Sequence, residues 1–336
     1  MFTYQFQIDK EACFYEWLFG LVAKESGKTK AEFYKNLSGR EWTAAELGAL
    51  EKLNEFLSSK TIFQREALKN KICLSNNSEL KNQEILSSIA KTLRPLFDEI
   101  WLKESSKLSY WKSALENYDF SRINNEFLPK IQNFFDVQKL DPTTITVKLF
   151  FGYNKNQCGG FAQKEISNCI GLNISSLDPE KKESAVGTLI HEISHLIGFL
   201  FQHNKMLFQD FIKNSLFKIL LSALLRKLKI IRRPFNIPWL INETIMRSII
   251  RNPLLWESYY QRKYFSPTQQ AINYRKKLET YDYRNYRNKF SDLTNFAALK
   301  ILDTTCNYLE NNKKLDADYS KRVAIAWREL LNRLTV

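Results

Sequence analysis

Two histidines stand four positions apart in the segment His-Glu-Ile-Ser-His, which begins at residue 191. On a helix, residues with this spacing project from the same face, so His191 and His195 can both reach one metal ion at roughly 2.1 Å. Glu192 then lies beside the ion without binding it, where its carboxylate can accept a proton from a zinc-activated water. The segment therefore predicts a zinc site with an adjoining general base, which is the chemistry of hydrolysis.

Chance is a poor explanation of this pattern. The chain has 336 residues and 3 histidines, and two of the histidines lie in this segment. With His at about 1% and Glu at about 6% of positions, a chain of this length contains on the order of 0.002 such patterns. Two structural histidines on a core helix are the alternative interpretation.

The pattern resembles the active-site motif of the zincin metallopeptidases, and within them the gluzincin branch, which includes thermolysin-like enzymes and metallo-aminopeptidases. The resemblance covers roughly residues 145–260. It implies zinc as the cofactor, peptides or proteins as substrates, and an antiparallel edge strand that precedes the active-site helix and pairs with the extended substrate. Residues 169–175 stand where that strand is expected.

A catalytic zinc site usually has three protein ligands, so one more is needed besides the two histidines. Glu243 follows Pro238 in a segment that predicts a proline-started helix, and it places an acid in a largely apolar setting. Gluzincins take their third ligand from a second helix with a similar Asn-Glu pair, so the resemblance implies this role for Glu243. The chain departs from the family in two respects: the gap after His195 is longer than usual, and position 247 is Arg247 rather than an acid.

Two alternatives to this ligand assignment stay open. Arg247 lies at i+4 from Glu243, so an ion pair between them would make Glu243 a structural residue. His203 is the remaining histidine and the competing ligand. A helix that continues past His195 would place His203 about 12 Å along its axis, too far to share the ion.

Hydrolysis also needs a hydrogen-bond donor for the tetrahedral oxyanion. No histidine follows His203 in the sequence, so a tyrosine or an arginine must supply this donor. Tyr259 and Tyr260 are the nearest tyrosines after Glu243, with Tyr264 close behind. We take Tyr259 and Tyr260 as the catalytic candidates, and a packed or surface aromatic is the alternative for each.

The elements that must position these residues indicate an α+β, mostly helical fold. Residues 1–137 show apolar positions at helical spacing and predict a helical N-terminal region throughout. Residues 138–336 are predicted to form a zincin-like domain, in which a small sheet packs on the active-site helix and a helical C-terminal subdomain follows. Breaks between the N-terminal helices are expected near residues 26–30, 58–61, 75–78 and 103–107.

After residue 142 the pattern changes to short strands and then a long helix. The strands and turns are expected in this order: a strand over 145–151, a turn at 159–160, a strand over 161–163, a turn at 164–167 and a strand over 169–175. Asp178 and Pro179 predict the start of a helix that runs past His195, and its apolar residues cover more than one face, which indicates burial. Residues 206–233 are predicted as a basic amphipathic insertion between the two metal-bearing helices.

Composition favours a folded chain, because 44% of the residues are hydrophobic and 26% are charged. Charges interrupt the longest apolar stretch, residues 206–231, so we expect no transmembrane segment. The first residues lack the pattern of a secretory signal, which predicts a cytoplasmic protein. The 5 cysteines have no CxxC spacing, so neither a disulfide framework nor a cysteine zinc site is expected.

The net charge of +14 leaves room for an acidic partner, which could be nucleic acid, an anionic membrane surface or an acidic peptide. Arginines and tyrosines alternate in the C-terminal half and could stack on single-stranded bases, although solvated helix faces explain them more simply. The sequence therefore favours a zinc-dependent peptidase. Two other classes stay open: a zincin-fold binding protein without catalysis, and a basic nucleic-acid-binding protein.

Histidine ligation makes metal affinity depend on pH. Imidazoles must be neutral to coordinate a metal, so we expect the affinity for zinc to fall below about pH 6. Titration with a zinc-sensitive chelator between pH 5 and pH 7 measures this. An affinity that is constant over that range would argue against histidine ligands.

Overall fold

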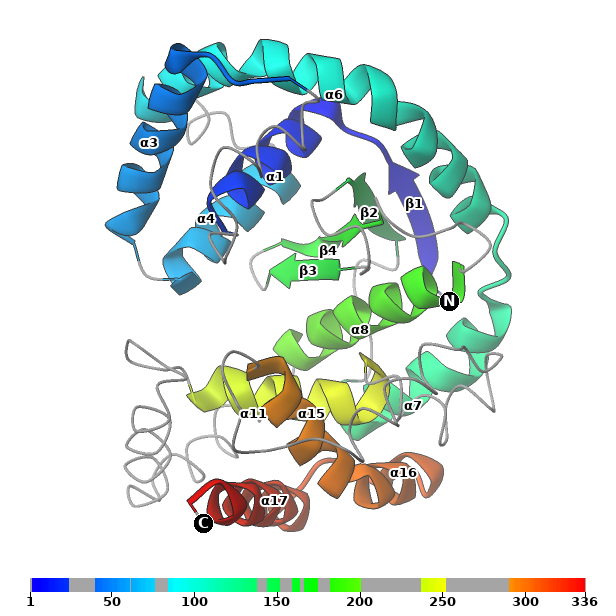
Figure 1. The fold of residues 1–336 in the computed structure, drawn as a ribbon. Coiled ribbons are helices and arrows are strands. Elements are labelled where there is room, and N and C mark those ends of the chain that lie inside the picture. The colour runs from blue at the N-terminus through cyan, green and yellow to red at the C-terminus, as the bar shows by residue number, and fades with distance from the viewer. Residues whose placement is uncertain are drawn as a thin grey trace. The chain divides into compact units, whose positions relative to one another are not determined.

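The fold is taken from a computed structural model, which describes residues 2–23, 40–60, 62–75, 84–137, 144–151, 159–163, 166–174, 182–200, 237–251 and 290–335. Within these ranges the chain is mostly helical and contains one small four-stranded sheet (Figure 1). The chain divides into two compact units: the first contains Phe2–Tyr118 and Pro142–Glu192, and the second contains Asp119–Asp141 and Ile193–Val336.

The sheet of the first unit is built from four strands in the order β1-β2-β4-β3. β1 pairs with β2 and β2 pairs with β4, both in parallel, whereas β3 pairs with β4 in antiparallel fashion. In β2, Thr144, Thr146 and Lys148 alternate with buried apolar residues, and the strand is buried on both faces from Val147 to Phe150. The strands are β1 (Thr3–Gln7), β2 (Thr144–Phe150), β3 (Gly159–Gln163) and β4 (Ile166–Asn173).

The strand predictions for residues 145–151, 161–163 and 169–175 are confirmed by β2, β3 and β4, whereas other expectations in this region are wrong. Gly159 and Gly160 lie in strand β3 instead of a turn. Of the turn expected at 164–167, Ile166 and Ser167 belong to β4. β4 is an internal strand, so the antiparallel strand at the end of the described sheet is β3.

The N-terminal region is not helical throughout, because β1 is a strand. Residues Thr3–Gln7 pair in register with Thr144–Lys148 of β2. Five residues are too few to show a clear period, and the long sequence separation of the two strands hides the pairing from any local pattern. The chain up to Tyr118 and the sheet belong to one compact unit.

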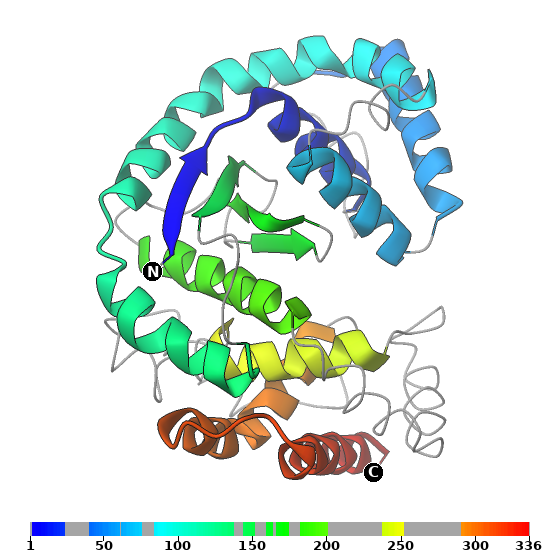
Figure 2. The ribbon, with the colours of Figure 1, turned by 180° about the vertical axis from the view of Figure 1, so that it is seen from behind.

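Helices of the first unit pack around this sheet, and both ribbon views show the long helix α6 passing α1 and β1 (Figures 1 and 2). The expected break near 103–107 is wrong, because α6 continues through it. Leu108, Trp111 and Leu115 are buried and keep the helical period, while the polar residues of 103–107 occupy the outer side. The helices are α1 (Lys10–Ala23), α3 (Ala44–Ser58), α4 (Ile62–Leu74) and α6 (Glu84–Glu116).

Two of the other predicted helix breaks are confirmed: α3 ends at Ser58 before α4 begins at Ile62, and α4 ends at Leu74. The break expected at 26–30 lies outside the described residues. No helix in the described ranges combines the length and the apolar run that crossing a bilayer requires.

Helix α8 (Lys182–Leu200) confirms the predicted helix through His195. Every described side chain from Ala185 to Ile197 is buried, as the apolar residues on more than one face indicated. The boundary between the two units falls inside this helix, after Glu192.

The described parts of the second unit are helical. Their core contains Phe134, Tyr308 and Tyr319, whose rings meet edge to face. The elements are the π-helical turn η1 (Ile123–Phe127), α7 (Leu128–Phe134), α11 (Ile237–Met246), the π-helical turn η3 (Arg247–Arg251), α15 (Phe290–Lys300), α16 (Leu302–Glu310) and α17 (Ala317–Thr335).

The start of α3 holds a carboxylate whose charge stabilises the first unit. Glu46 accepts a hydrogen bond from the Thr43 backbone N–H at 2.7 Å, and its own N–H donates to Thr43 Oγ1 at 3.2 Å. Arg40 donates to both carboxylate oxygens of Glu46, at 2.7 and 3.0 Å. These interactions, those of Arg40 foremost, lower the pKa of Glu46 to about 2.

A lowered pKa in the folded state means that the stabilisation is present at neutral pH and is lost as pH falls from about 4.5 towards 2. We expect Glu46→Gln to cost about 1–2 kcal/mol at pH 7, a value reduced by solvent screening of the partly exposed Arg40. The difference in the free energy of unfolding between Glu46→Gln and the wild type should shrink towards zero near pH 2. Urea unfolding at several pH values measures it, and a difference that does not vary with pH would contradict the assignment.

Candidate metal centre

Helix α8 places His191 and His195 one turn apart on the same face, as their spacing predicts. Both imidazoles are buried, with 1% and 8% of the residue exposed. Because one continuous helix carries both, their mutual position is a local property of the chain. The surrounding apolar residues of α8 remove bulk water from these rings.

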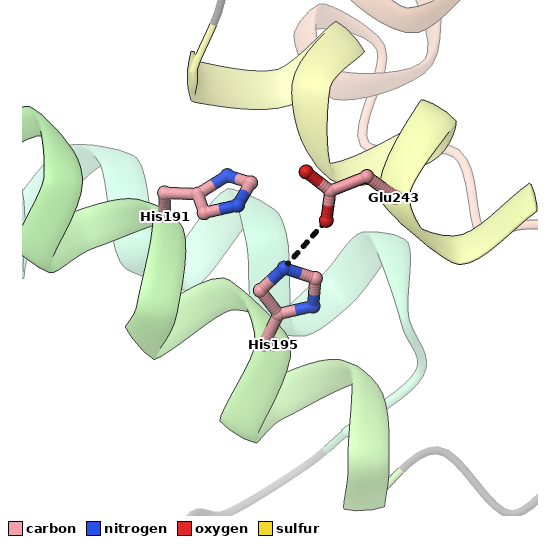
Figure 3. Close-up of side chains that lie close together, drawn as sticks. All are labelled: His191, His195 and Glu243. Atoms are coloured by element: carbon pink, nitrogen blue, oxygen red, sulfur yellow. Dashed lines mark ion pairs between the residues drawn. The ribbon is translucent and has the colours of Figure 1, made fainter. Parts of the chain in front are cut away.

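Helix α11 supplies the carboxylate. It begins at Ile237 with Pro238 in second position, where a missing backbone N–H costs nothing. Glu243 is 5% exposed, and its Oε2 lies 3.3 Å from Nε2 of His195 (Figure 3). One ligand atom from each of His191, His195 and Glu243 lies within 4.8 Å of the other two.

Two imidazoles and one carboxylate form a donor set that suits a borderline divalent cation such as zinc. Four-coordinate zinc holds its ligands roughly 2.1 Å away, which sets neighbouring ligand atoms roughly 3.4 Å apart. The contact between His195 and Glu243 already has this spacing, at 3.3 Å. The three side chains therefore fit one ion of this size with a small adjustment of their torsions.

The carboxylate of Glu243 has a different partner on each oxygen. Oε2 faces His195, whereas Oε1 accepts a hydrogen bond from Nε of Arg247 at 2.6 Å. The ion pair that the i+4 spacing suggested is thus formed, but it occupies only the oxygen that faces away from the histidine. Ion pairing with Arg247 and proximity to His195 are therefore compatible.

Asn242 is a neighbour of His195 that the sequence marked only as part of the Asn-Glu pair. Its side-chain nitrogen lies 3.4 Å from Nδ1 of His195. Metal binding through Nε2 requires the ring proton to be on Nδ1, and the amide then presents its oxygen to that proton after a 180° rotation. Asn242 can in this way select the histidine tautomer that coordinates a cation.

Asn295 is a second neighbour of the site, and no sequence signal pointed to it. Its Oδ1 accepts a hydrogen bond at 2.7 Å from Arg247, which in turn binds Glu243. Asn295 lies on α15, so α15 and α11 together fix the guanidinium. Only the folding of the second unit brings these residues together.

Glu192, the predicted general base, is 4% exposed and lies against β3. A methyl group at Gly160 would come within 2.6 Å of Cγ and 2.8 Å of Oε1 of Glu192, and within 2.9 Å of Thr188. Only a glycine allows the strand to approach α8 this closely. The site therefore requires Gly160, which the sequence suggested only as part of a turn.

The predicted oxyanion donors Tyr259 and Tyr260 lie outside the described residues, as does Tyr264. The competing ligand His203 and the basic segment 206–233 lie outside them as well. Among the predicted residues, the described structure thus brings together His191, His195 and Glu243.

Because alanine at position 160 would collide with Glu192, we expect Gly160→Ala to displace that side chain and lower the free energy of unfolding by about 1–3 kcal/mol. Gly159→Ala is the matched control, because a methyl group there meets only Asn173 Cβ, at 3.9 Å. The control should change stability by no more than about 0.5 kcal/mol. Urea unfolding of both variants measures this, and equal stabilities would contradict the close approach.

Comparison with protein-family models found no matching family, and comparisons with curated proteins and with solved structures found no match. The likeness to the zincins therefore rests on two features of this chain. The first is the His-Glu-Ile-Ser-His segment on α8. The second is the position of Glu243 beside the two histidines, and these features support a proposal about function.

Proposed function

We propose that the chain is a zinc-dependent peptidase in which Glu192 is the general base. The observation that carries the proposal is the buried group formed by His191, His195 and Glu243, whose donor atoms lie within 4.8 Å of one another. The sequence supports it independently, because the same two histidines bracket a glutamate at the spacing that zinc hydrolases use.

Each residue has a distinct role in this proposal. The two histidines and Glu243 hold the zinc ion, which polarises the scissile carbonyl and lowers the pKa of a water molecule when bound. Glu192 accepts a proton from the attacking water and then delivers it to the leaving amine nitrogen. Burial of Glu192 keeps its carboxylate out of bulk water.

A peptide is favoured as substrate by the position of β3. This strand is at the end of the described sheet, and Gly160 in the strand touches Glu192. An extended peptide that pairs with the edge of β3 would run past the general base, and main-chain hydrogen bonds would hold it there.

A zincin-fold protein that holds zinc without catalysis is the second candidate. The observation that favours it is the pairing of Glu243 with Arg247, which stabilises this buried carboxylate whether or not a cation is bound. Turnover of peptides separates the two candidate functions.

We also propose that the protein is cytoplasmic, where thiols such as that of Cys13 stay reduced.

We expect Glu192→Gln to retain one zinc ion per chain and to lower peptide turnover by about 100-fold or more, because an amide cannot accept the proton. Glu243→Ala and His195→Ala should lose most of the zinc. Glu116→Gln, an identical change at an exposed position on α6, serves as the control and should behave like the wild type. Elemental analysis measures the zinc content, and a peptide-library assay measures the turnover. Undiminished turnover by Glu192→Gln would refute the mechanism.

A further inference from the structure

The carboxylate of Glu243 is divided between two positively polarised partners. Oε1 is held by Nε of Arg247 at 2.6 Å, while Oε2 points to Nε2 of His195 at 3.3 Å. Arg247 is 8% exposed, so its charge acts in a region of low dielectric constant where electrostatic effects are strong. The oxygen that could give a second bond to a cation is therefore already engaged.

The guanidinium of Arg247 is held by two hydrogen bonds, one to Glu243 and one to Asn295. Arg247 lies four residues from Glu243, at the point where α11 passes into the π-helical turn η3. Its Nη1 donates to Oδ1 of Asn295 on α15 at 2.7 Å. These two hydrogen bonds hold the planar guanidinium between the carboxylate and α15, so it cannot follow the carboxylate freely when a cation binds.

Buried hydroxyl groups hold the turn that carries Arg247. Ser248 Oγ donates to the carbonyl oxygen of Ile245 at 2.7 Å, and Thr305 Oγ1 donates to Ser248 Oγ at 2.9 Å. The hydroxyl of Tyr319 lies 2.8 Å from Thr305 Oγ1. The turn is thus tied to α16 and α17, which makes the position of Arg247 a property of the whole second unit.

We propose that Arg247 is a positioning residue that restricts Glu243 to one-oxygen coordination and weakens the affinity of the site for a divalent cation. This inference rests on the proposed zinc site, but it does not require that the protein hydrolyse peptides. One-oxygen coordination by Glu243 and one bond from each histidine leave the fourth position of a tetrahedral ion for water. The positive charge of Arg247 repels the cation and withdraws electron density from the shared carboxylate.

Whether removal of Arg247 raises or lowers the affinity for zinc distinguishes the proposed role from a purely structural one. If Arg247 only supported the fold, its removal would loosen Glu243 and reduce the affinity for zinc, as loss of a supporting partner commonly does. If Arg247 opposes the cation, its removal takes away a positive charge that compensates the buried carboxylate and repels the cation. The metal-free protein then becomes less stable while the affinity for zinc increases.

The experiment compares Arg247→Met with the charge-matched control Arg247→Lys. We expect Arg247→Met to bind zinc about tenfold more tightly than the wild type in competition with a chromophoric chelator, because a positive charge near the cation is removed. Its thermal midpoint should fall without metal and recover with zinc, because a ligand that binds only the folded state stabilises it. Arg247→Lys keeps the positive charge and should bind zinc within about threefold of the wild type. Zinc binding by Arg247→Met that is equal to or weaker than that of the wild type would overturn the proposal.

Cobalt(II) in the wild-type protein provides a second test that needs no variant. One-oxygen coordination predicts a four-coordinate ion, which has intense visible d–d absorption. The weak absorption of a six-coordinate ion would overturn the proposal, because two histidines, one carboxylate oxygen and one water supply four donor atoms. Zinc binding without peptide turnover would refute only the proposed peptidase, whereas a wild-type protein that binds no zinc would refute both.

Discussion

A buried carboxylate is the constraint around which the candidate site is organised. Glu243 is almost completely removed from water, and a charge in such a place is tolerated only with partners of opposite charge or with hydrogen bonds. Arg247 satisfies one oxygen, and the other faces His195. These two partners fix the orientation of the carboxylate, so the arrangement that stabilises the second unit also shapes the candidate cation site.

The close approach of β3 to α8 is a second constraint, and it acts on Glu192 instead of the three candidate ligands. Gly160 lies against Glu192 and Thr188 because it has no side chain. This contact holds Glu192 within a narrow space inside the first unit. The contact between one glycine of the strand and the helix thus restricts the space that the Glu192 side chain can occupy.

Sequence patterns predicted the helices and most strands near the site. They failed where one local signal is compatible with two structures. The polar residues of 103–107 suggested a helix end, but polar residues also occupy the outer side of a continuous helix. The glycines at 159 and 160 suggested a turn, yet glycine is also used where a strand must approach another element closely. In each case one local signal was compatible with two structures, and packing decided between them.

The sequence by itself determined the positions of His191, Glu192 and His195, because a helical period of 3.6 residues places side chains four apart on one face whatever the rest of the chain does. It also identified Glu243 as a candidate ligand with Arg247 as its neighbour, since both lie on one short segment. Only the tertiary structure decided that the two oxygens of Glu243 have separate partners, that Asn295 holds Arg247, and that β1 joins the sheet beside β2. These relations join residues far apart in the chain, and no local period or propensity records which distant segments meet.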